Sequence, residues 1–100
     1  MAIKILVVED EKRMYNYLKK MLLKIDASFA EEGPVAGVAE LRDVLLSGEH
    51  YDLLISDVRI NGGTCFNAFE VVQPTMPVIC SLPGRWLQGV GTREHERVGE

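Results

Sequence analysis

The chain has 100 residues, of which 47% are apolar and 26% are charged, and this composition is typical of one small globular domain rather than a disordered, collagen-like or disulfide-stapled chain. No apolar run approaches the roughly 20 residues that a membrane span needs, and the first residues lack the pattern of a secretory signal, so we expect a cytoplasmic protein with no membrane partner. The formal net charge is −4, and the sequence has no basic stripe that would bind the phosphate backbone of a nucleic acid, which argues against direct binding of nucleic acid.

The first half of the chain alternates between strand and helix patterns. Residues 3–8 form a nearly unbroken apolar and β-branched run, which predicts a strand covered on both faces. Apolar residues recur at helical spacing over residues 11–25 and predict an amphipathic helix. A short strand over residues 28–32 and a helix over residues 38–48 complete this part.

The same alternation continues to residue 80. Residues 51–56 predict a second buried strand, and a turn-rich segment follows at residues 61–63. A short helix over residues 65–72, capped by Thr64, leads into a fourth strand over residues 76–80. Strands that alternate with helices throughout predict an α/β domain with a doubly wound parallel sheet.

The last twenty residues differ in character. Residues 81–100 contain four glycines and show no sustained helix or strand period. We therefore expect the domain to occupy residues 1–80 and residues 81–100 to form an irregular tail.

Acidic residues follow directly after two of the predicted strands. Glu9 and Asp10 follow the first strand, and Asp57 follows the third. In a parallel sheet with right-handed crossovers, ligands bind outside the carboxyl ends of the strands. Where these two strands are neighbours, three carboxylates meet in one shallow pocket.

Carboxylates gathered in one pocket need a compensating charge. Two of them about 4 Å apart repel by roughly 4 kcal/mol at an effective dielectric of about 20, a substantial part of the roughly 5–15 kcal/mol by which a domain is stable. A bound cation removes this repulsion, and oxygen ligands without His or Cys nearby favour Mg²⁺ or Mn²⁺ over zinc. The alternative is that Glu9 and Asp10 are favourable charges at a helix N-terminus and that Asp57 is a turn former.

Three segments together resemble the receiver domain of bacterial two-component response regulators. They are ILVVEDE at residues 5–11, YDLLISDVR at residues 51–59 and MPVI at residues 76–79, so that the resemblance covers about residues 2–80. Residues 61–72 further resemble receivers that are joined to LytTR-type DNA-binding domains, which act in transcription regulation. The resemblance implies a flavodoxin-like sheet in the order 2-1-3-4, from which the fifth strand of the family is missing, so we expect an incomplete receiver.

The resemblance also implies a function. A sensor histidine kinase would transfer a phosphoryl group to Asp57, the phosphoacceptor, while Mg²⁺ is held by Glu9, Asp10, Asp57 and the backbone carbonyl of Arg59. Such transfer depends mainly on positioning and charge stabilisation, so a carboxylate beside a divalent ion is a sufficient core for it. The chain would then be a signalling domain and not an enzyme.

The chain departs from the receiver pattern at two positions. Receivers carry a Thr or Ser at the end of the fourth strand, but that position falls on Leu82 when it is counted from Pro77, and Ser81 serves as the hydroxyl only with a one-residue deletion. Receivers also carry a Lys after the fifth strand, whereas this chain has no Lys after Lys24. The alternative function is therefore a receiver-shaped interaction module without phosphorylation-dependent signalling.

Three further expectations follow from the sequence. A dinucleotide-binding domain would carry G-x-G-x-x-G after the first strand, and this chain has Glu9, Asp10 and Glu11 there, which repel anions. Without a fifth strand, the fourth strand becomes a sheet edge, which favours a homodimer through that edge. Cys65 and Cys80 are expected to be reduced thiols, and no chemistry is assigned to them.

Overall fold

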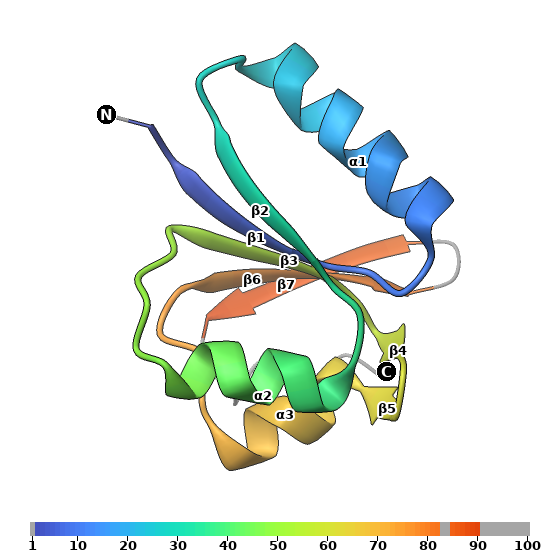
Figure 1. Cartoon of the computed structure of the whole chain (residues 1–100), viewed down its shortest axis with the longest axis vertical. Coiled ribbons are helices and arrows are strands. Elements are labelled where there is room, and N and C mark those ends of the chain that lie inside the picture. Colours follow the sequence, from blue (N-terminus) through green and yellow to red (C-terminus); the bar gives the residue numbers. More distant parts are fainter. Residues whose placement is uncertain (1, 83–84, 91–100) are drawn as a thin grey trace.

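The computed structural model, which describes residues 2–82 and 85–90, has a central β-sheet with helices on both faces (Figure 1). Four strands of the sheet are parallel: β1 (Lys4–Val8), β2 (Ala30–Val35), β3 (Leu53–Asp57) and β6 (Pro77–Leu82). The strand order is β2-β1-β3-β6-β7, so β1 and β3 lie side by side in the middle of the sheet. The α/β architecture with a parallel sheet, expected from the alternating patterns, is confirmed.

The fifth strand of the sheet corrects two expectations. β7 (Arg85–Val90) pairs with β6 in the antiparallel direction, although these residues were expected to be irregular. The pairing also means that β6 is an inner strand, so the expected edge at the fourth strand is wrong and β7 takes that place. Antiparallel strands need only a short turn between them, which is why a strand can follow β6 directly without a crossover helix. The rest of the expected tail, residues 91–100, lies outside the described residues.

The helices are divided between the two faces of the sheet. α1 (Lys12–Ile25) lies on one face, and α2 (Val38–Leu46) and α3 (Cys65–Val71) lie side by side on the other (Figure 1). This is the arrangement that right-handed crossovers between parallel strands produce. It leaves the carboxyl ends of β1 and β3 at one edge of the sheet.

The alternation of side chains along the strands fills a separate core on each face. Leu6 and Val8 of β1 point into the cluster beneath α2 and α3, where Phe69 is also buried. Ile5 and Val7 of the same strand point into the smaller cluster beneath α1. These four side chains are at most 2% exposed, which explains why the sequence of this strand is a nearly continuous apolar run.

The turn-rich segment after β3 forms a small hairpin that the sequence did not reveal. Its strands are β4 (Arg59–Ile60) and β5 (Gly63–Thr64). Gly63 has a φ of +148°, and a Cβ there would collide with the side chain of Asn67. That side chain accepts a hydrogen bond of 2.8 Å from the backbone N–H of Thr64, the expected cap of α3. The hairpin therefore connects the end of β3 to the start of α3.

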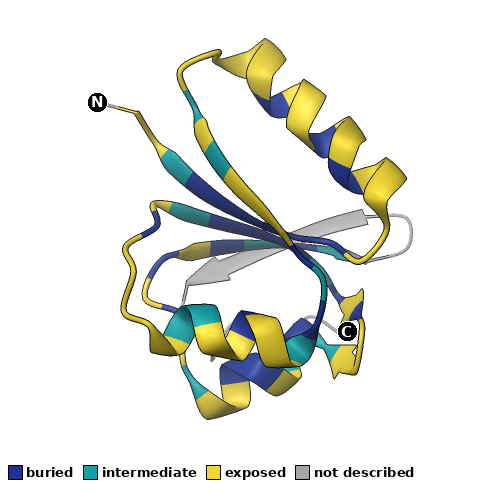
Figure 2. Cartoon of the chain, viewed as in Figure 1, coloured by how far each residue is buried: buried dark blue, intermediate teal, exposed yellow. Residues whose placement is uncertain are grey.

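The outer edge strand β2 is unlike the inner strands. Its sequence is AEEGPV, and only Val35 is buried. Figure 2 shows the exposed residues along this strand and over the outer surface of α1, whereas the inner strands are mostly buried. Glu32 of β2 forms an ion pair of 3.1 Å with Lys4 of β1. This edge of the sheet is charged along its open side.

Candidate metal centre

Three acidic side chains meet at the carboxyl ends of β1 and β3. Glu9 and Asp10 follow the last residue of β1, and Asp57 is the last residue of β3. The parallel register pairs Val8 with Ser56, which brings the two strand ends to the same level. One carboxylate oxygen from each of Glu9, Asp10 and Asp57 lies within 4.8 Å of the others. The three acids that the sequence singled out are therefore one cluster.

The three carboxylates differ in their exposure to solvent. Glu9 is buried, with 6% of its surface exposed, whereas Asp57 is half-buried and Asp10 is exposed. The backbone of Glu9 is fixed by a hydrogen bond of 2.8 Å from its N–H to the carbonyl of Val35. Its side chain accepts a hydrogen bond of 3.2 Å from the N–H of Glu11. The cluster therefore has a buried wall at Glu9 and opens to solvent at Asp10.

The electrostatics of the cluster favour a positive occupant. The pKa of Glu9 is raised from 4.5 to about 7. The largest cause is burial, because desolvation disfavours the charged form; the Glu11 N–H partly opposes the shift, and the negative charges of Asp57 and Asp10 add to it. Burial also raises the pKa of Asp57, to which Asp10 and Glu11 add negative charge, while the backbone N–H groups of Val58 and Arg59 oppose the rise. Each of these shifts reflects the cost of burying a carboxylate, to which the neighbouring negative charges add, and a bound cation would relieve this cost.

The donor set fits a hard divalent ion. The cluster offers carboxylate oxygens from three residues, of which one is exposed, so part of a coordination sphere would be left to water. Mg²⁺ is bound in this way in proteins, through a few carboxylates with several retained waters. Arg59, whose carbonyl was expected as a further ligand, begins β4 two residues after Asp57.

Ser81 lies beside the cluster on the neighbouring strand. The parallel register of β3 and β6 pairs it with Asp57. Its carbonyl accepts a hydrogen bond of 3.1 Å from the N–H of Val58, so the backbone at the end of β6 is tied to the backbone just after Asp57. The expected hydroxyl residue therefore lies at the correct edge of the sheet and on the strand next to the acids.

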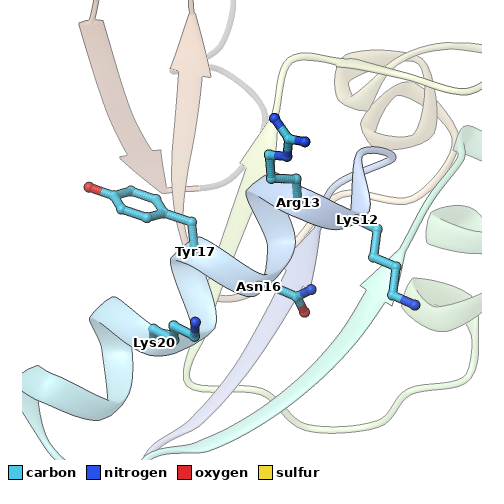
Figure 3. Close-up of a pocket in the computed structure, with 5 residues that line it drawn as sticks. All are labelled: Lys12, Arg13, Asn16, Tyr17 and Lys20. Atoms are coloured by element: carbon cyan, nitrogen blue, oxygen red, sulfur yellow. The ribbon is translucent and has the colours of Figure 1, made fainter.

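A second concave surface lies on α1 and is basic. Its lining residues are on the outer side of the helix, and they are Lys12, Arg13, Asn16, Tyr17 and Lys20. Figure 3 shows that the side chains spread in different directions instead of converging on one point. The helix carries five basic residues and no acidic one, against a net charge of −4 for the whole chain. This surface is a basic patch without the convergent groups of a built site.

The sequence did not predict that the two cysteines lie together. Cys65 at the start of α3 and Cys80 in β6 are 15 positions apart, and the structure places their Sγ atoms 4.0 Å from each other. No sequence motif links two cysteines at this spacing, and only the packing of α3 against the end of β6 brings them together. Glu11 was also not expected to contribute, but its N–H binds Glu9 and its charge acts on Asp57.

Comparisons with known proteins support the fold alone. No protein-family model and no curated protein matches the chain. A search of solved structures finds a likeness to a chain described as the yeast Spc42 trimeric coiled coil, amino acids 181–211, fused to another structure, with a TM-score of 0.61 and 22% sequence identity over 77% of this chain. The matched region is 52% of that chain, so this protein spans about half of its length. Within the described residues, the helices lack the length and apolar character needed to cross a bilayer.

Proposed function

We propose that this chain is a receiver-like phosphoacceptor domain with a flavodoxin-like doubly wound sheet, in which Asp57 accepts a phosphoryl group from the phosphohistidine of a sensor histidine kinase. The observation that carries the proposal is the cluster of Glu9, Asp10 and Asp57, whose carboxylate oxygens lie within 4.8 Å of one another at the ends of two neighbouring parallel strands. The edge outside the carboxyl ends of the strands is where open α/β sheets bind their ligands. The site would act in the cytoplasm as part of a phosphorelay.

Asp57 is the acceptor that the geometry favours. It is the last residue of β3, and its side chain is half-buried, so its backbone is fixed while an oxygen remains accessible. Glu9 is almost fully buried, which leaves less room for a phosphoryl group. In the transfer, an Asp57 oxygen forms a bond to phosphorus as the phosphorus–nitrogen bond breaks, and the histidine nitrogen keeps the electron pair. Burial and the negative charges of Asp10 and Glu11 raise the pKa of Asp57, and a bound cation would oppose this shift by favouring the ionised carboxylate.

Glu9, Asp10, Asp57 and the Arg59 carbonyl are the residues that would hold Mg²⁺. When bound, the ion would neutralise negative charge on the transferred phosphoryl oxygens. The protein's own contribution is positional: the Val35 carbonyl of β2 fixes the backbone of Glu9, and Asp57 is held as the last residue of β3. Ser81, the register partner of Asp57, is the residue we assign to contact a phosphoryl oxygen through its hydroxyl.

The distribution of lysines along the chain supports a second function. The chain has no Lys after Lys24, so the cation that would pair with a phosphoryl group on Asp57 is not supplied by a lysine of the later segments. A receiver-shaped module that binds partners without phosphorylation-dependent signalling is therefore the competing proposal. A homodimer through an open strand edge is compatible with either function.

The experiment that separates the two functions measures covalent phosphorylation. Intact mass is recorded after incubation with Mg²⁺ and a small acyl phosphate, with and without a chelator. The proposal predicts one phosphoryl adduct that requires Mg²⁺ and is lost in Asp57→Asn. Asp43→Asn is the matched control, because Asp43 is an exposed aspartate on α2, away from the cluster. A folded wild-type sample without an adduct would support the interaction module instead.

A further inference from the structure

The two cysteines of the chain lie together in the larger core. Cys65 is the first residue of α3 and is fully buried, and Cys80 lies in β6 with 3% of its surface exposed. Both are free thiols, and their Sγ atoms are 4.0 Å apart, within reach of a hydrogen bond between sulfurs. A disulfide has a sulfur–sulfur bond of about 2.05 Å, so the two atoms need to approach by about 2 Å.

The backbone holds the two cysteines in this relation through a single residue. Val58 donates its N–H to the carbonyl of Ser81, next to Cys80, at 3.1 Å. The carbonyl of the same residue accepts a hydrogen bond of 2.9 Å from the N–H of Cys65. Because both contacts are made by one residue of the chain after β3, the start of α3 and the end of β6 are fixed relative to each other. The close approach of the thiols is therefore built into the fold.

We propose that Cys65 and Cys80 are a peroxide-oxidisable dithiol that closes to an intramolecular disulfide in the folded protein. This site is separate from the phosphoacceptor proposal and does not depend on it. The closed form would join α3 covalently to β6 across residues 66–79.

The environment of the pair indicates which sulfur reacts first. The hydrogen bond between the thiols raises the pKa of Cys65, to which burial adds, and lowers the pKa of Cys80. Cys80 is also the more exposed of the two. Since the thiolate is the reactive form of cysteine, the direction of these shifts favours Cys80 as the sulfur that attacks peroxide.

The reaction balances with peroxide as the two-electron oxidant. The Cys80 thiolate attacks one peroxide oxygen, the oxygen–oxygen bond breaks, and Cys80 becomes a sulfenic acid as one water is released. The Cys65 sulfur then attacks the Cys80 sulfur, the sulfur–oxygen bond breaks, and a second water leaves. Two thiols lose two electrons and two protons in total, and the peroxide is reduced to two waters. A small oxidant suits this site, because the surrounding core offers little room for a bulky one.

The test uses the whole chain with hydrogen peroxide under native conditions. After quenching, the protein is unfolded in the presence of an alkylating reagent, digested with trypsin and analysed by mass. Both cysteines fall in the tryptic peptide of residues 60–85, which has no internal Lys or Arg, so one peptide reports the state of the pair. We expect this peptide to carry no alkyl groups and to weigh two hydrogens less than its reduced form, and we expect prior treatment with a reductant to restore two alkylation sites.

The variants Cys65→Ala and Cys80→Ala keep one thiol each and cannot form the internal bond. Each is expected to lack the dehydrogenated peptide after the same treatment, with circular dichroism used to confirm that it is folded. An unfolded sample treated with the same dose of peroxide serves as the control that the dose is sufficient to oxidise thiols. If that control is oxidised while the peptide from the native wild type still takes two alkyl groups, the proposal is overturned. Cross-linking between chains instead of within one chain would also overturn it. If the variants do not fold, the mass of the wild-type peptide by itself still supports or overturns the internal disulfide.

Discussion

Asp57 of β3 and Ser81 of β6 are direct register partners in neighbouring parallel strands. The backbone next to Asp57 is also hydrogen-bonded to Ser81, because the N–H of Val58 donates to the Ser81 carbonyl at 3.1 Å. A hydroxyl at this position could contact a phosphoryl group on Asp57 with little movement of the backbone. The relationship gives Ser81 a specific role that can be measured.

Replacing the Ser81 hydroxyl should slow phosphorylation of Asp57. In Ser81→Ala, we expect the rate of adduct formation with an acyl phosphate and Mg²⁺ to fall by about 10- to 150-fold, because a hydrogen bond to a charged group contributes roughly 1.5–3 kcal/mol. Thr75→Ala is the matched control, since Thr75 is an exposed hydroxyl residue at the opposite end of β6. Equal rates in wild type and Ser81→Ala would remove Ser81 from the site.

Divalent ions should stabilise the fold in a pH-dependent way. A ligand that binds only the folded chain at 100 times its Kd adds about 2.7 kcal/mol to the free energy of unfolding. We expect Mg²⁺ to raise the melting temperature at pH 8 and to do so less at pH 6, because protons compete for Glu9, whose pKa is about 7. Asp57→Asn should reduce the effect, and a chelator should reverse it. An identical shift from NaCl at matched ionic strength would show that general screening, and not a bound ion, is responsible.

Removing the charge of Glu9 should stabilise the metal-free protein at alkaline pH. The pKa of Glu9 is raised from 4.5 to about 7 on folding, so the folded state binds the proton more tightly than the unfolded state. The contribution of Glu9 to stability is therefore fully present below pH 4.5 and is lost as the pH rises to about 7. After allowance for solvent screening, we expect Glu9→Gln to gain on the order of 1–2 kcal/mol over wild type at pH 8 in the presence of a chelator.

This gain should disappear below pH 4.5, where wild-type Glu9 is protonated in both states. Denaturant unfolding across the pH range measures it. Glu70→Gln is the control, because Glu70 is an exposed residue of α3. A Glu9→Gln variant that is less stable than wild type at pH 8 without metal would contradict the assigned cost of the buried carboxylate.

The stability of the fold should depend on the core strand that ends at the site. Leu54 is fully buried in the middle of β3, and we expect Leu54→Ala to lower the free energy of unfolding by about 2–5 kcal/mol through lost burial and the cavity that remains. Leu46 at the end of α2 is 60% exposed, so Leu46→Ala should change stability by less than about 0.5 kcal/mol. The two leucines compare the same substitution in two environments, and similar losses would mean that the described core is wrong.

The elements with strong local patterns were predictable from the sequence. Residues 3–8 contain β1, and the helical spacing over residues 11–25 is confirmed as α1 (Lys12–Ile25). Glu9 and Asp57 were identified because acid directly after a buried strand is a local feature of the sequence. That they lie close together could be predicted only with the strand order, and the strand order depends on contacts between segments far apart in the chain.

The features that the sequence did not reveal depend on pairing between segments. β7 contains a glycine and has no clear period, and it becomes a strand by pairing with β6. The hairpin of β4 and β5 has two-residue strands, which are too short for a periodic pattern. Cys65 and Cys80 are neighbours because α3 and β6 pack in the same core, where Val58 also links the two backbones beside them. The binding of Mg²⁺ and phosphorylation at Asp57 stay predictions.

The charged β2 edge has a consequence for polymerisation. A strand that is to pair with another chain needs free N–H groups along its open side. β2 carries Pro34, which has no N–H, and the charged Glu32, which is ion-paired with Lys4. Growth of a fibre by strand addition requires two receptive edges on each molecule. With β2 blocked, association through β7, the other outer strand of the described part of the chain, would end after two copies, so strand pairing would give a finite assembly instead of a fibre.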